Sequence, residues 1–267
     1  MAVLGPGSLT TYWRFQRGVA KAQLAAWLPA AGRRLLIDIS GPSALAATQA
    51  AARGHTVVRV LPAVRAEGDG AHAALSAVTT GRAAHRAHRR PGGAAWTGPP
   101  PGRITPVVAE PGSLGFLADG CADGVIAEDG ALSRHLVSED LAAEIARVLR
   151  PGGRYFSQQV GAGSNRELTD FMMGPQPVDP GRSPQVAVAE ATDAGLVITG
   201  LREQAVRVEF YDVGAVVYFL RKVLWTVPGF TVDGYRAQLA LMHEHIRAHG
   251  SFVCHAQRFL IEARKPG

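Results

Sequence analysis

The stretch Leu35-Leu36-Ile37-Asp38-Ile39-Ser40-Gly41-Pro42-Ser43-Ala44 decides the fold. An apolar strand runs into an acidic residue and a tight turn, and an alanine-rich helix over 45–53 then ends at Gly54. A β-branched strand over 56–61 follows, so the segment predicts a βαβ unit with a right-handed crossover. In such units the loop after the first strand and the N-terminus of the helix hold an adenosine-type cofactor.

Length and composition indicate an ordinary globular protein. The 267 residues are 47% hydrophobic and 19% charged, which is enough to bury a full core. The chain has no apolar run of about 18 residues, and we expect no secretory signal because residues 1–7 lack a basic flank followed by an apolar core. Cys121 and Cys254 lie far apart without CxxC spacing, which argues against a zinc site and a disulfide scaffold. We expect a cytoplasmic protein with reduced thiols and no membrane partner.

The net charge of +6 comes largely from one basic segment. That segment contains Arg82, His85, Arg86, His88, Arg89 and Arg90. It can attract nucleic acid or an anionic substrate. We favour a solvated surface, because no aromatic stacking platform and no nucleic-acid motif accompanies it. No metal site is expected either, since His243, His245 and His249 lack a suitably spaced fourth ligand.

Helices and strands alternate through the rest of the chain. The expected helices cover residues 12–31, 71–88, 138–150, 183–194, 210–223 and 232–249. The expected further strands cover residues 104–109, 124–127, 154–160, 196–208 and 259–264. A proline- and glycine-rich loop is expected over 91–102.

A string in the middle of the chain resembles a known family. Leu141-Ala-Ala-Glu-Ile-Ala-Arg-Val-Leu-Arg-Pro-Gly-Gly-Arg-Tyr155 is similar to the helix, turn and fifth strand of class I S-adenosylmethionine-dependent methyltransferases. The resemblance extends in register from about Leu24 to Lys265. It implies an α/β fold with a Rossmann-like, seven-stranded, mostly parallel sheet flanked by helices. A helical cover is expected as an insertion near the C-terminus.

The same resemblance implies one methyltransferase-like domain over 1–267. Residues 1–32 then form an N-terminal helical cover, and residues 33–165 form the cofactor-binding half. Residues 166–267 form the acceptor-side half, with its helical insertion at about 210–250.

The cofactor loop departs from the family pattern of an acidic residue followed by Gly-x-Gly-x-Gly. Asp38 matches the acidic residue, but Ser40, Pro42 and Ala44 stand at the three glycine positions, and only the intervening Gly41 is glycine. Glycines there let the backbone turn sharply and approach a cofactor without a Cβ in the way. The resemblance therefore implies S-adenosylmethionine as cofactor, bound through a degenerate loop.

The ribose contact also departs from the pattern. The family places a carboxylate at the end of the second strand, where it accepts hydrogen bonds from the ribose hydroxyls, and this chain has Leu61. Each unsatisfied group costs roughly 1–3 kcal/mol, so cofactor binding should be weakened. Other positions match: Glu110 at the adenine contact, and Glu128 with Asp129 at the end of the fourth strand. Glu110 and Asp129 can equally be ordinary loop carboxylates. The cofactor-binding residues implied are Asp38, Ser40, Gly41, Pro42, Leu61, Glu110 and Glu128.

The C-terminal part supplies candidates for an acceptor pocket. By resemblance to a subset of the family, Tyr211, Asp212, Tyr218, Trp225 and His243 line it. Tyr218 and Trp225 are equally explained as core aromatics. Of the adjacent Gln158 and Gln159 only one can face the cleft, and we assign Gln159 to the substrate. The candidate general bases are Glu128, His135 and His243.

Three functions remain open. We favour methyl transfer to a small-molecule acceptor. The alternative is a non-catalytic relative, either a partner subunit or a ligand-binding module, that has lost normal cofactor binding. Repurposing for another reaction or for an RNA partner ranks last. A homo-oligomer and a hetero-oligomer are both compatible with the sequence.

Overall fold

The computed structural model describes residues 2–4, 9–29, 33–41, 43–62, 102–109, 113–128 and 139–267. Within these ranges, eight strands form one sheet in the order β1-β7-β8-β6-β5-β2-β3-β4. The strands are β1 (Ala2–Leu4), β2 (Leu35–Asp38), β3 (Thr56–Pro62), β4 (Ile104–Ala109), β5 (Ala122–Glu128), β6 (Leu149–Val160), β7 (Val197–Phe210) and β8 (Phe252–Arg264). All neighbours pair in parallel except β8, which is antiparallel to both β6 and β7. The expected seven-stranded, mostly parallel sheet is confirmed, and the short β1 extends it beside β7.

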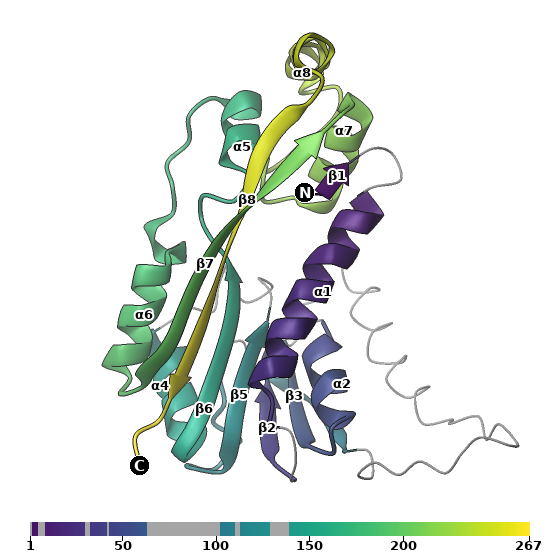
Figure 1. Ribbon diagram of the computed structural model, residues 1–267. Coiled ribbons are helices and arrows are strands. Elements are labelled where there is room, and N and C mark those ends of the chain that lie inside the picture. Colours follow the sequence, from purple (N-terminus) through teal and green to yellow (C-terminus); the bar gives the residue numbers. More distant parts are fainter. Residues whose placement is uncertain are drawn as a thin grey trace, which may run out of the picture.

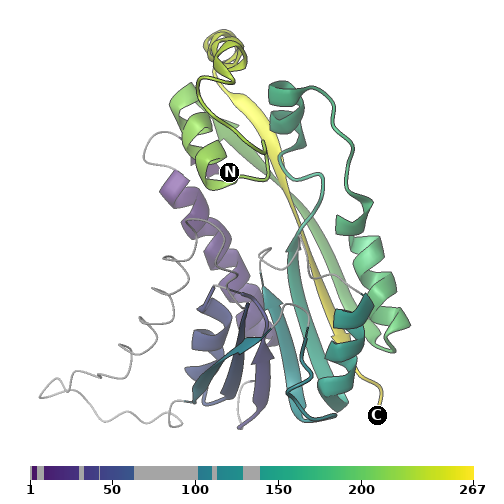
Figure 2. The ribbon, with the colours of Figure 1, turned by 180° about the vertical axis from the view of Figure 1, so that it is seen from behind.

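Helices cover both faces of the sheet (Figure 1). They are α1 (Leu9–Trp27), α2 (Leu45–Ala51), α4 (Glu139–Val148), α5 (Arg166–Met173), α6 (Pro184–Asp193), α7 (Val213–Lys222) and α8 (Arg236–His249), with a 3₁₀ turn η1 (Pro180–Arg182). The apolar residues of α1 and α2 pack on one face with Leu36 and Phe156. Those of α4 and α6 pack on the other face, which Figure 2 shows from behind, with Ile37 and Val125. Strands β2 and β5 are neighbours, but the helices that follow them, α2 and α4, lie on opposite faces of the sheet.

Helix α1 is fastened to the sheet by Trp27. The indole is buried and lies 5.4 Å from the ring of Phe156. The Arg154 guanidinium lies 4.9 Å from the centre of the Trp27 ring, and its Nη1 donates to the Trp27 carbonyl at 2.9 Å. Large aromatic surface and a cation over the ring both favour this contact. The contact fixes the helix that covers the β2, β5 and β6 face.

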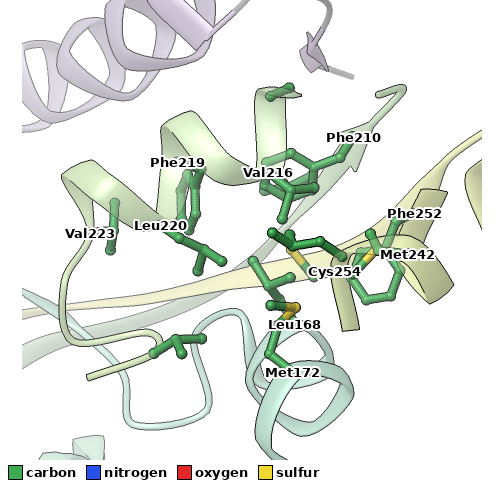
Figure 3. Close-up of a cluster of buried hydrophobic side chains, with 14 of the residues drawn as sticks. Leu168, Met172, Phe210, Val216, Phe219, Leu220, Val223, Met242, Phe252 and Cys254 are labelled. Carbon is green, nitrogen blue, oxygen red and sulfur yellow. The ribbon is translucent and has the colours of Figure 1, made fainter. Parts of the chain in front are cut away.

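The helical cover expected near the C-terminus rests on a two-stranded extension of the sheet. Strands β7 and β8 run beyond the other strands, and helices α5, α7 and α8 pack on them (Figure 1). Figure 3 shows the buried cluster that joins these elements, with Phe210, Phe219, Leu168, Met242 and Cys254 among its members. Because these side chains are buried together, the helical cover has a packed hydrophobic core of its own.

Several boundaries differ from the sequence prediction. The helix expected from 210 begins at Val213, because Asp212 caps it by accepting from the Ala215 amide at 2.8 Å. Strand β8 begins at Phe252 instead of 259, since its first residues pair with β7. Helix α5 was not predicted. The predicted helix over 71–88, the loop over 91–101 and the basic segment 82–90 lie outside the described residues.

Trp27→Ala tests how strongly the α1 contact holds the fold. We expect the free energy of unfolding to fall by about 3–5 kcal/mol, because a large buried ring leaves a cavity. Leu241→Ala, at a residue that is 64% exposed, should change it by less than about 0.5 kcal/mol. Urea denaturation measures both variants, and equal losses would show that α1 is not held through Trp27.

Candidate functional site

Three polar side chains gather on one face at the carboxyl ends of adjacent strands. Leu36, Ile126 and Phe156 pack beneath α1 in one cluster. Side chains alternate along a strand, so the residues two positions further on, Asp38, Glu128 and Gln158, project from that same face. Strands β2 and β5 are neighbours, and their following helices lie on opposite faces. Open α/β sheets bind ligands at such a switch point.

Asp38 organises the loop that follows β2. Its carboxylate is fully buried; Oδ1 accepts from the Ser40 amide at 2.9 Å and Oδ2 from the Ala47 amide at 3.1 Å. Ala44, at the N-cap of α2, makes no side-chain cap bond. Asp38 therefore supplies the cap from outside the helix, and its charge suits the positive helix end.

Ser40 and Gly41 keep the turn closed although the family's glycines are absent. Ser40 Oγ accepts from the Glu128 amide at 2.8 Å, and the Ile39 amide donates to the Ile126 carbonyl at 2.9 Å. Gly41 has a φ of 71°, a conformation that favours glycine. The serine at a family glycine position thus ties the loop to the end of β5.

Arg59 is a functional candidate that the sequence analysis missed. Its Cα is the β3 partner of Asp38, so both side chains project from one face. The side chain is 7% exposed, and Nη2 donates to the Gly41 carbonyl at 3.2 Å. The sequence did contain a signal for it: Arg59 stands between Val57 and Leu61 on one face of the strand, and both of these are apolar and buried. A buried cation therefore lies directly against the loop.

The electrostatics of Asp38 reflect this setting. Burial raises the pKa of its carboxyl above the ordinary value, whereas hydrogen bonds from Ser40 and the charge of Arg59 act in the opposite direction.

Glu128 and the two glutamines are separated by strand alternation. The Glu128 side chain is 4% exposed and lies at the same edge as Asp38. Gln158 projects toward α1, where its Nε2 donates to Gln23 Oε1 at 3.1 Å. Gln159, our sequence candidate, projects from the opposite face and donates to Ser157 Oγ at 2.9 Å. The structure therefore groups Gln158, and not Gln159, with Asp38 and Glu128.

A separate cleft of about 230 Å³ opens just beyond the end of β6. Its lining comes from the segment after β6, helix α5, the segment leading to η1, and the loop between α7 and α8: Gly161, Ala162, Ser164, Arg166, Thr169, Met173, Gln176, Pro177, Asp179, Arg182, Trp225, Thr226 and Pro228. Trp225, predicted for the acceptor pocket, is among them and is 42% exposed. The buried Thr226 Oγ1 has no hydrogen-bond partner among the described residues. The cleft combines an aromatic surface with polar groups.

The other acceptor candidates do not line this cleft. The Tyr211 hydroxyl donates to the buried Glu209 carboxylate. This hydrogen bond is the main cause that raises the pKa of Tyr211, and partial loss of solvent contact is the next. Asp212 caps α7. Tyr218 is half-exposed with the Lys222 ammonium near its ring, and His243 is exposed on α8.

Some sequence predictions fall beyond the described ranges. His135, Pro42, Glu110 and Asp129 lie outside them. Within the described part of the chain, no group of three or more His, Cys, Asp or Glu side chains is placed to hold a metal ion. No described helix has the length and apolarity to cross a membrane.

Known structures resemble this chain in fold, whereas known sequences do not. No protein-family model and no curated protein matches the sequence. A candidate methyltransferase from Bacillus halodurans C-125 is similar in structure, with a TM-score of 0.59 at 13% identity over 92% of this chain and 99% of that chain. The chain has the class I methyltransferase fold.

Two further neighbours share this methyltransferase fold. Geranyl diphosphate methyltransferase in complex with S-adenosylmethionine gives a TM-score of 0.52 at 16% identity, over 99% of this chain and 94% of that chain. The [4+2]-cyclase SpnF gives 0.51 at 17% identity, over 93% and 81%. The structural similarity establishes the fold. At such low sequence identities it does not establish the reaction, which depends on the residues of the site.

Within the methyltransferase fold, the described residues fit the framework of an adenosyl site but change its polarity. The carboxylate of Asp38, the positive φ of Gly41 and the link from Ser40 to Glu128 build the loop. Leu61, at the end of β3, is buried and offers no side-chain acceptor there. Arg59 adds a positive charge beside the loop.

The raised pKa of Asp38 predicts a pH dependence of stability. Its contribution is fully present below the unfolded pKa of about 3.9 and is lost as the pH rises through the raised folded pKa. Asp38→Asn should lack this decline in the free energy of urea unfolding as the pH rises above about 4. The control is Asp179→Asn, which removes the carboxylate that accepts from the Gly181 amide on η1 and should keep the decline. Parallel curves for Asp38→Asn and the wild type would contradict the assignment.

Proposed function

We propose that the protein is a cytoplasmic, S-adenosylmethionine-dependent methyltransferase that acts on a small-molecule acceptor. One observation carries the proposal: Asp38 holds the loop after β2, and Ser40 ties that loop to Glu128 at the end of β5. This array closes the switch point of the sheet, where ligands of such folds bind. It persists although three family glycines are absent.

The proposed cofactor contacts follow from this array. Asp38, Ser40, Gly41 and Glu128 are in place at the carboxyl edge, and Pro42, Leu61 and Glu110 remain assigned to the same ligand from the resemblance. The cofactor supplies the methyl group when bound. The chain's own part is to hold the reactants in line and exclude water, because transfer by direct displacement gains most from approach geometry.

Glu128 is the proposed general base among the three sequence candidates. It lies on the same face and edge as Asp38, and its backbone is fixed by Ser40. A carboxylate held there can accept a proton from an acceptor hydroxyl or amine within hydrogen-bond reach. His243 is exposed on α8, the outer helix of the cover (Figure 1). His135 stays a sequence candidate.

The cleft beyond β6 supports a small-molecule acceptor. Its volume of about 230 Å³ and its mixed lining suit a compact molecule with an apolar face and a few polar groups. Trp225 offers the apolar surface, and Ser164, Gln176 and Asp179 add polar groups to the lining. Of the acceptor contacts proposed from the sequence, Trp225 lies in this cleft, whereas Gln159, Tyr211, Asp212 and Tyr218 do not line it.

A second candidate is a non-catalytic ligand-binding module or partner subunit. Leu61 in place of a ribose carboxylate and the buried Arg59 favour it. The cyclase SpnF also has this fold, so the fold does not dictate methyl transfer. In this function the protein keeps the Asp38 array as a scaffold, alone or as part of an oligomer.

Calorimetric titration with S-adenosylmethionine and S-adenosylhomocysteine separates the two functions. The proposed methyltransferase should bind both compounds, with affinity weakened to about the micromolar-to-millimolar range by the lost ribose contact. No heat and no thermal shift with either compound would contradict the proposal and support the non-catalytic module.

Leu61→Asp tests the ribose assignment. A carboxylate at the end of β3 can accept from the ribose hydroxyls, and such charge-assisted bonds contribute about 1.5–3 kcal/mol each. We expect affinity to rise about tenfold or more for both adenosyl compounds, since both contain the ribose. Leu241→Asp, which adds a carboxylate at an exposed residue of α8, should leave both affinities near the wild-type values. Unchanged binding by Leu61→Asp would show that Leu61 does not face the ribose.

A further inference from the structure

Helix α7 presents an aromatic and basic side to solvent. Its other side carries Phe219 and Leu220, which point into the buried cluster that Figure 3 shows. Tyr218, Arg221 and Lys222 are exposed. Residues three and four positions apart share one side of a helix, so these three side chains form one outward-facing group.

The chain continues from α7 into two large apolar side chains that are also exposed. Leu224 is 66% exposed and Trp225 is 42% exposed. Single apolar residues on a surface need no explanation, but a contiguous group of them marks an interaction site. We call Tyr218, Arg221, Lys222, Leu224 and Trp225 the α7 surface.

The α7 surface is positively charged. Residues 213–232 contain two basic residues and no aspartate or glutamate. The acidic residues on either side of this stretch are engaged elsewhere, because Asp212 caps α7 and Asp233 forms an ion pair with Arg236. Asp179, in the cleft that Trp225 also lines, accepts a backbone amide. The α7 surface therefore complements a negatively charged partner.

The side chains of the α7 surface suit the boundary between lipid headgroups and acyl chains. Tryptophan and tyrosine are enriched at that boundary because their rings are apolar at one end and polar at the other. Lysine and arginine lay their stems on apolar groups and extend the charge outward, and Lys222 Nζ lies 5.9 Å from the centre of the Tyr218 ring. The core of a protein–protein interface is instead depleted of lysine. A lipid surface is thus the favoured partner.

We propose that the α7 surface docks on anionic lipid bilayers. Leu224 and Trp225 enter the headgroup region, and Arg221 and Lys222 pair with the lipid phosphates. Such peripheral docking needs no spanning helix, and the part of the chain that the structure describes has none. The expectation of no membrane partner rested on the lack of a spanning run, and it does not extend to a contact of this kind.

Docking brings the cleft beyond β6 to the bilayer, because Trp225 belongs to the α7 surface and also lines that cleft. An acceptor dissolved in the lipid then reaches the cleft without passing through water. This consequence rests on the proposed function, whereas the docking itself does not.

Co-sedimentation of the purified protein with vesicles tests the proposal. The wild type should bind vesicles of equal parts phosphatidylcholine and phosphatidylglycerol at least about tenfold more tightly than vesicles of phosphatidylcholine alone, because two basic residues contact the anionic surface. The double variant Arg221→Gln with Lys222→Gln should weaken binding to the mixed vesicles by about tenfold or more. Leu224→Ser should weaken it by about tenfold, since the insertion of that side chain is lost.

Helix α8 supplies matched controls. Leu241 is 64% exposed, close to the exposure of Leu224, and Arg236 and Arg247 are exposed on the same helix. Leu241→Ser removes the same apolar side chain, and Arg236→Gln with Arg247→Gln removes the same net charge. Both should leave vesicle binding near the wild-type value. Losses as large as those of the α7 variants would indicate a general attraction of a basic protein and overturn the inference.

The wild type decides the question even if a variant does not fold. Equal binding to the two kinds of vesicle, or binding to neither, overturns docking on anionic lipid. Binding to neither would assign the α7 surface to a protein partner instead. Because the calorimetric titration with adenosyl compounds contains no lipid, its failure would overturn the proposed function and leave this inference standing.

Discussion

The site in this fold depends on the buried carboxylate of Asp38. Two backbone amides, from Ser40 and Ala47, donate to it, so that one side chain closes the turn after β2 and caps α2. Burying a carboxylate is costly, and the two backbone hydrogen bonds and the charge of Arg59 offset that cost only in part, so the pKa of Asp38 stays raised. The same turn also holds the end of β5, because Ser40 Oγ accepts a hydrogen bond from the Glu128 amide. The turn after β2, the start of α2 and the end of β5 are therefore linked through that carboxylate.

The departures from the family pattern affect different properties of the site. The missing glycines alter the loop's side chains, but Gly41 supplies the positive φ that the turn requires, so the backbone path is retained. Leu61 instead leaves the end of β3 without the carboxylate that the family pattern has there, and the buried Arg59 lies beside the loop. A fold can tolerate both changes because neither leaves the Asp38 network incomplete.

The sequence predicted the elements with local signals and missed those set by long-range packing. The strand over 104–109 was predicted at its observed bounds, and Asp38 was found by its place after a strand. The start of α7 at Val213 was missed because apolar residues on both sides of Asp212 masked its role as the cap. Helix α5 is held by Leu168 and Met172 in a core that forms only in the folded chain. Arg59 was missed because its position beside Asp38 depends on the pairing of β3 with β2. Gln159 was chosen over Gln158 because the sequence does not show which of two adjacent glutamines faces the cleft.

Amide hydrogen exchange in Asp38→Ala tests the central claim most directly. If Asp38 holds the carboxyl edge together, exchange should accelerate by about tenfold or more at the amides of Ser40, Ala47 and Glu128, while the Gly181 amide, which Asp179 holds on η1, keeps its wild-type rate. Unchanged protection at all three amides would contradict the account, because the loop, the helix end and β5 would then be held by something other than this carboxylate.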